Sequence, residues 1–138
     1  PVLPGRCQSL HGHSWLFKFF VSAELDENGV SVDYGILKKI VRGFIDTNWD
    51  HGTALGVSDP LVYSLWDDPY HTKTYVFGKT EESEEYPWPT VEAFAHVAAK
   101  HIQKLLNEEL WKSDPCVERV EVRETAVNFG IWDRSVDG

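Results

Sequence analysis

The hydrophobic and polar positions of the chain alternate in some segments and recur every three or four residues in others. Alternation and many aromatic and β-branched residues predict a strand over residues 14–25, followed by turn residues at 26–29 and a short second strand at 30–32. These two strands are expected to form a hairpin. Near the other end of the chain, residues 117–122 alternate, and residues 126–132 are expected to pair back with them.

Two other segments have helical periodicity. Asp33 is placed to cap a helix over residues 34–47, whose apolar side chains form one stripe. Thr90 occupies the same position before a longer helix over residues 91–111. The order strand, strand, helix, helix, strand, strand predicts an α+β domain with two helices packed on one face of an antiparallel sheet.

The segment between the two helices, residues 50–88, has no regular pattern. It contains a short helical candidate at 60–66 and a strand candidate at 72–77. The acidic run at 81–85 is expected to be a solvated loop.

Composition narrows the classes of function. A length of 138 residues suits a single domain, and a net charge of −9 argues against binding nucleic acid or an anionic membrane over a broad surface. Because the sequence has no long apolar run, no signal-peptide pattern and only two cysteines, we expect a cytoplasmic location. The chain begins at Pro1 and contains no methionine, so we expect further residues to precede it in the natural protein.

The most specific chemistry lies near the beginning of the chain. Cys7 precedes His11 and His13 closely, and alternate residues of an extended segment point to the same side. Two imidazoles that face one point are typical of a zinc site, and a catalytic zinc usually has three protein ligands and one open position. A closed structural zinc site would need four ligands, and the sequence offers too few at suitable spacings. The third ligand of a catalytic site is not evident in the sequence either.

Together with four further groups of residues, this motif resembles the 6-pyruvoyl-tetrahydropterin synthase / queuosine-pathway 6-carboxytetrahydropterin synthase family. The resemblance implies the tunnelling fold (T-fold), formed by one domain over residues 1–138 that lacks its first strand. It also implies a ring-type homo-oligomer, usually a homohexamer. The shared groups, in the order of the family, are Cys7-x3-His11-Gly12-His13, Val32-Asp33-Tyr34, Asp50-His51, Pro89-Thr90-Val91-Glu92 and Glu124-Thr125.

The resemblance implies a zinc-dependent lyase that acts on 7,8-dihydroneopterin triphosphate. The three-residue gap between Cys7 and His11 is similar to that of queuosine-type members, so the expected product is 6-carboxy-5,6,7,8-tetrahydropterin. The alternatives are a 6-pyruvoyl-tetrahydropterin synthase and a pterin-binding T-fold protein without turnover.

The family pattern assigns a role to each matching residue. His11 and His13 correspond to zinc ligands, and Cys7 to the proton-abstracting thiolate. Asp50 and His51 correspond to a second acid–base pair. The remaining matches are expected to bind substrate: Glu124 receives the pterin ring, and Thr90 and Glu92 contribute to its pocket, although Glu92 also suits the positive end of a helix dipole.

Two departures from the family pattern remain. The third zinc histidine of the family lies on a strand upstream of the cysteine, so either this chain lacks that strand, which we favour, or His71 or an acidic residue substitutes. The segment at 53–88 is longer than in compact members and is expected to reshape the pocket rim or a subunit contact. The sequence does not decide which basic residues bind the triphosphate; the candidates are Lys18, Lys38, Arg42 and Arg123. A structural role is expected for Cys116, His71, His96 and His101.

Overall fold

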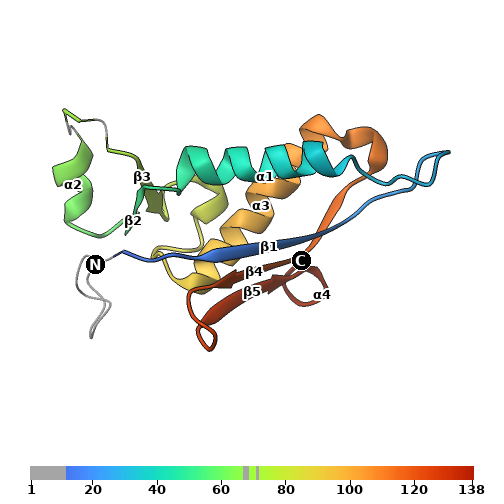
Figure 1. Cartoon of the computed structure of the whole chain (residues 1–138). Coiled ribbons are helices and arrows are strands. Elements are labelled where there is room, and N and C mark those ends of the chain that lie inside the picture. Colours follow the sequence, from blue (N-terminus) through green and yellow to red (C-terminus); the bar gives the residue numbers. More distant parts are fainter. Residues whose placement is uncertain (1–11, 67–68, 71) are drawn as a thin grey trace.

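The computed structural model describes residues 12–66, 69–70 and 72–138, and its largest sheet has three antiparallel strands (Figure 1). The central strand, β4 (Cys116–Arg123), pairs with β1 (Leu16–Ser22) on one side and with β5 (Phe129–Asp133) on the other. Along β1 every second side chain is partly buried, which places three apolar residues on the face that meets the helices.

Both long helices begin at the predicted caps. The carboxylate of Asp33 accepts hydrogen bonds from two backbone amides at the start of α1 (Tyr34–Asn48), and the hydroxyl of Thr90 accepts one from Ala93 at the start of α3 (Val91–Glu109). These bonds satisfy amides that have no partner within the helix. The two helices lie on the same side of the sheet, which confirms the predicted α+β arrangement (Figure 1).

The core lies between α3 and the sheet. Ile102 and Leu106 of α3 are fully buried, as are Val120 and Val122 of β4, and each such side chain contributes about 1.5–3 kcal/mol when it leaves water. Gly130 of β5 permits the close approach of the helix, because a Cβ atom there would lie 2.6 Å from the Val91 side chain. The start of α3 is therefore fixed against the end of the sheet.

A smaller unit follows α1. Its two parallel strands are β2 (Thr53–Gly56) and β3 (Thr74–Phe77), and α2 (Leu61–Trp66) lies between them in sequence. The short helix and the second strand were predicted, whereas β2 was not, because four residues give too little alternation to recognise. The other short elements are the 3-10 helices η2 (Glu81–Ser83) and η3 (Trp111–Ser113), and α4 (Arg134–Asp137) at the end of the chain.

The predicted hairpin at the beginning of the chain is wrong. The turn itself forms, with the Asp26 carboxylate accepting from the amides of Asn28 and Val30, but residues 30–32 form no strand. Only three residues separate the turn from Asp33, which already caps α1, so the chain has no room for a second strand.

The acidic run is solvated only in part: Glu81, Glu84 and Glu85 are exposed as predicted, but the segment is not simply a loop. It contains η2, in which Ser83 is buried and the Glu82 side chain is 14% exposed. Glu82 faces α3, where Nε2 of His101 and Nζ of Lys104 lie 3.3 and 3.5 Å from its carboxylate oxygens. The Lys104 ammonium and the contact with the His101 ring therefore hold this segment against α3. Among the described residues, no helix combines the length and apolar character that crossing a membrane requires.

Candidate active site

His13 and Glu124 form the first part of the candidate site. His13 precedes β1 and Glu124 follows β4, and the antiparallel pairing of Leu16 with Arg123 brings them to the same end of the sheet. Nδ1 of His13 lies 2.6 Å from Oε1 of Glu124, and the two side chains are 32% and 21% exposed. Because an ionised carboxylate only accepts hydrogen bonds, Nδ1 carries the proton of this contact.

The turn between β4 and β5 holds Glu124 from the other side. The side-chain amide of Asn128 donates to Oε2 of Glu124 at 2.6 Å, and the backbone amide of Glu124 donates to the Asn128 carbonyl. The Thr125 hydroxyl accepts from the Asn128 amide at 3.0 Å and closes the turn. Both oxygens of the Glu124 carboxylate therefore have a protein partner.

Asp50 and His51 form the second part, directly after α1. Nδ1 of His51 lies 3.0 Å from Oδ2 of Asp50, but these side chains are 91% and 53% exposed. His51 has a φ of 54°, in the left-handed region that few residues other than glycine adopt. The pair has the geometry of an acid–base couple, and the backbone turn rather than side-chain packing sets its direction.

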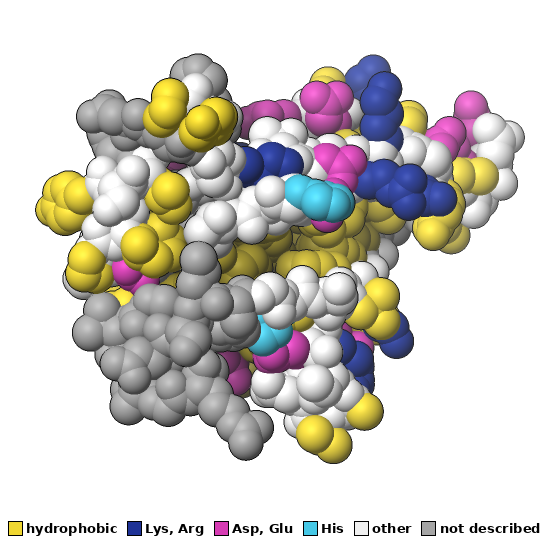
Figure 2. Space-filling model, turned by 60° about the vertical axis from the view of Figure 1, so that its left-hand side comes forward, with side chains coloured by type: hydrophobic (Ala, Val, Ile, Leu, Met, Phe, Trp, Pro, Cys, Tyr) yellow, Lys and Arg dark blue, Asp and Glu magenta, His cyan; other side chains and the backbone are white. Residues whose placement is uncertain are grey.

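Aromatic contacts join the two parts through the core. The Trp15 ring lies beside the His13 ring at a tilt of 34°, with ring centroids 5.5 Å apart, and meets Phe94 of α3 edge to face at 4.2 Å. Trp49, which immediately precedes Asp50, contacts the same Phe94 ring at 4.7 Å. One core side chain, Phe94, thus contacts a tryptophan that lies close in sequence to each candidate pair. Figure 2 shows two histidine side chains on one face of the molecule with hydrophobic side chains exposed between them.

The indole N–H groups of two partly buried tryptophans are themselves buried. The Nε1 atoms of Trp15 and Trp49 have no partner among the described residues. A buried donor without an acceptor costs about 1–3 kcal/mol, so these two rings are held by their aromatic contacts rather than by polar ones.

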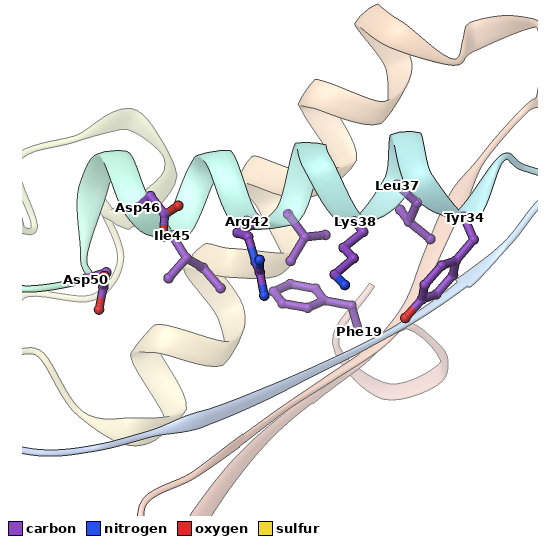
Figure 3. A pocket seen from close by; sticks show the side chains of 9 residues that line it. Phe19, Tyr34, Leu37, Lys38, Arg42, Ile45, Asp46 and Asp50 are labelled. Carbon is purple, nitrogen blue, oxygen red and sulfur yellow. The ribbon is translucent and has the colours of Figure 1, made fainter.

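A groove of about 600 Å³ lies between α1 and β1 and ends at Asp50. Phe19 of β1 points up toward α1, and Lys38 and Arg42 point from α1 toward its ring (Figure 3). Of the four candidate cations, these two line the groove. By contrast, the Arg123 guanidinium stacks on Phe129 at 4.6 Å and donates to the Ala126 carbonyl.

The structure places the other predicted residues as follows. Thr90 uses its hydroxyl to cap α3, and Glu92 is exposed in the first turn of that helix, so a role of either residue in substrate binding stays a prediction. Cys7, His11 and His71 lie outside the described residues. Within the described part of the chain, no three His, Cys, Asp or Glu side chains come close enough to hold a metal.

The polar contacts of α3 were missed by the sequence analysis. Nε2 of His101 lies 3.3 Å from the Tyr75 hydroxyl as well as from Glu82, and burial lowers the pKa of this imidazole. Nδ1 of His96 lies 2.6 Å from the Tyr86 hydroxyl, whose pKa is raised by burial and by nearby carboxylates. Spacing along α3 could not reveal these partners, because they come from β3 and the segment around η2.

Cys116 has the structural environment that was expected. It is a free thiol at the start of β4, and burial raises its pKa, which disfavours the reactive thiolate.

Comparison with known proteins identifies related chains. Residues 2–134 match the family described as 6-pyruvoyl tetrahydropterin synthase. The 6-carboxy-5,6,7,8-tetrahydropterin synthase of Rickettsia bellii (strain RML369-C) is 31% identical over 100 residues, which cover 59% of this chain and 72% of that protein. The 6-carboxy-5,6,7,8-tetrahydropterin synthase of Bacillus subtilis (strain 168) is 28% identical over 129 residues, which cover 93% of this chain and 70% of that protein.

A solved structure supports the fold. The crystal structure of an uncharacterised protein from Wolinella succinogenes superposes with a TM-score of 0.60 at 22% identity, covering 93% of this chain and 81% of that one. At this identity the likeness concerns the arrangement of helices and strands alone.

Proposed function

The chain belongs to the 6-pyruvoyl tetrahydropterin synthase family, and we propose that it is a lyase that forms 6-carboxy-5,6,7,8-tetrahydropterin from 7,8-dihydroneopterin triphosphate. The observation that carries this proposal is the presence of two histidine–carboxylate pairs, His13–Glu124 and Asp50–His51. Each pair is close in sequence to a tryptophan, Trp15 or Trp49, that contacts the Phe94 ring. A substrate between the two pairs would meet a histidine–carboxylate couple at each end.

The choice of product rests on two supports. The relatives in Rickettsia bellii and Bacillus subtilis are named for the 6-carboxy product. The short gap between Cys7 and His11 is similar to the queuosine-type arrangement, and the position of the thiolate decides which bond of the side chain it helps to break. A 6-pyruvoyl product is the alternative.

We propose that His11 and His13 hold a zinc ion together with a third ligand. The contact of Nδ1 of His13 with Glu124 suits this role, because metal-bound histidines usually donate their other ring N–H to a carboxylate or carbonyl. When bound, zinc would make a coordinated hydroxyl of the substrate more acidic. Glu124 would fix the direction of the His13 ring and, with its remaining lone pairs, accept the N–H groups of the pterin.

The other side chains would move protons and bind the triphosphate. Cys7 would abstract a proton as a thiolate, and His51, held by the Asp50 carboxylate, would transfer the second proton. Because Lys38 and Arg42 line the groove that ends at Asp50, they are the cations we favour for the phosphate groups.

Product analysis tests the reaction. The zinc-loaded protein is incubated with dihydroneopterin triphosphate, the pterin product is identified by mass, and acetaldehyde is assayed separately. We expect 6-carboxytetrahydropterin with acetaldehyde and triphosphate. A pyruvoyl product without acetaldehyde would overturn the queuosine-type assignment. Binding of pterin without any product would overturn the proposal that the chain is an enzyme.

Metal analysis tests the zinc site. His11→Ala and His13→Ala should each lose most of the bound zinc, because two imidazoles are needed beside the third ligand. His96→Ala is a matched control, since this histidine contacts Tyr86 on α3 and should leave the zinc content unchanged. Full zinc in both test variants would show that the site lies elsewhere.

A further inference from the structure

Lys73 connects the segment before β3 with the end of α1. Its ammonium group donates to the carbonyl of Asp46 at 2.5 Å and to the carbonyl of Asp50 at 2.6 Å. Its own backbone carbonyl accepts from the Thr53 amide at 2.9 Å. One residue, 23 positions beyond Asp50 in sequence, therefore contacts the chain on both sides of the turn that carries His51.

The end of α1 has a local need for this contact. The amides of Trp49 and Asp50 both donate to the Ile45 carbonyl. In a regular helix the Asp50 amide would donate to the Asp46 carbonyl instead, so that carbonyl lacks its usual helical donor. The last turn of α1 contains no basic residue. Lys73 supplies both a hydrogen-bond donor and a positive charge where the helix dipole is negative.

The same contact fixes the peptide that joins Asp50 to His51. Because these two side chains are largely exposed, they have little packing to orient them, and the left-handed backbone of His51 depends on its surroundings. Gly52 lets the lysine pass close to the turn, since a Cβ atom there would lie 3.0 Å from the Lys73 side chain. Lys73 thus holds the Asp50 carbonyl, which belongs to the peptide directly before His51.

We propose that Lys73 is a positioning residue for the Asp50–His51 pair. The inference rests on the proposed function, because it assumes that this pair transfers a proton to or from the substrate. On this proposal, the long segment between β2 and β3 places a lysine at the turn that carries the acid–base pair. The rival explanation is that Lys73 stabilises the end of α1 and nothing more.

Steady-state kinetics separates these explanations. In Lys73→Met, kcat should fall about ten- to hundredfold at a temperature well below Tm, because a small displacement of a proton-transfer group costs that much. KM and zinc content should stay unchanged, since Glu124 and His13 lie at the end of the sheet. Lys73→Arg, which keeps the charge and the donors, should recover much of kcat, and Lys39→Met on the exposed side of α1 is the matched control.

The outcomes are distinguishable. A lower Tm with unchanged kcat in Lys73→Met would leave only the capping role and overturn the proposal; if that variant does not fold, Lys73→Gln replaces it in the same comparison. Backbone amide exchange at residues 50–53 and the NMR signals of the His51 ring provide a readout without turnover. Should the wild-type chain make no product, the proposed function fails, while unchanged exchange and ring signals in the variant would separately refute positioning by Lys73.

Discussion

Two histidine–carboxylate pairs in the same molecule are held in different ways. His13 and Glu124 are half-buried at the end of the sheet, and Asn128 supports the carboxylate from a turn. His51 and Asp50 are mostly exposed, and the side chain of Lys73 contacts the backbone carbonyl of Asp50. A pair fixed through its side chains suits a task that needs constant geometry, such as ligand binding, whereas an exposed pair on a turn suits proton exchange with solvent.

Replacement of His51 gives the largest expected effect. His51→Asn should lower kcat by about 10²–10⁴, the usual contribution of a positioned acid–base group, because the amide cannot transfer a proton. Asn is chosen because it tolerates the left-handed backbone of this position. The free energy of unfolding should change by less than about 0.5 kcal/mol, as is usual at an exposed site, and denaturant titration measures it. Unchanged kcat would remove His51 from the mechanism.

Removal of the Phe94 ring should weaken both pairs together. Phe94→Ala should lower the free energy of unfolding by about 3–5 kcal/mol, because this ring contacts both Trp15 and Trp49 in the core. Phe94→Leu keeps most of the volume and should cost less. Urea titration followed by tryptophan fluorescence measures both variants. If Phe94→Ala were as stable as Phe94→Leu, the shared ring would not be the link between the two pairs.

Glu124 allows binding of pterin to be separated from support of His13. Glu124→Gln should weaken pterin affinity about 10–100-fold with little change in zinc content, since the amide oxygen can still accept from Nδ1 of His13. Glu124→Ala removes both contacts, so zinc content should fall as well. Fluorescence titration with neopterin and metal analysis give the two values. Equal zinc loss in both variants would mean that the charge, not the hydrogen bond, supports His13.

The smallest expected effect concerns the pH dependence of folding. Burial lowers the pKa of His101 below its ordinary value of 6.5, so the unfolded chain binds this proton more readily than the native one. The associated stability is present above pH 6.5 and is lost as the pH falls through the lowered pKa. In His101→Gln the free energy of unfolding should therefore fall less steeply as the pH drops below 6.5. The difference from the wild-type protein, measured by urea titration, should be less than about 1 kcal/mol. Parallel curves for both proteins would contradict the assignment.

The parts that the sequence predicted well are those with strong local signals. Both long helices begin at Asp33 and Thr90, because a capping side chain acts on amides two or three residues away. The strands on either side of the β4–β5 turn were also predicted, because residues 117–122 alternate and residues 126–132 were expected to pair back with them. The hairpin was wrong because the alternation of residues 30–32 competes with the cap at Asp33, and the cap prevails.

The candidate site was only partly predictable for a different reason. The motifs identified His13, Glu124, Asp50 and His51, but not that the carboxylate of Glu124 would contact His13, which depends on the register of β1 and β4. Lys73 carries no motif at all. Its role follows from a contact between segments far apart in sequence, and no local pattern encodes such a contact.

The backbone hydrogen bond from the Thr53 amide to the Lys73 carbonyl affects how the chain tolerates insertions and deletions. It brings together the two ends of the segment that carries α2, and the parallel pairing of β2 with β3 continues from there. The entropy of closing such a loop depends only weakly on its length, with each doubling costing about 0.6 kcal/mol. Insertions or deletions around α2 should therefore change the surface of the protein while the turn that carries His51 keeps its shape.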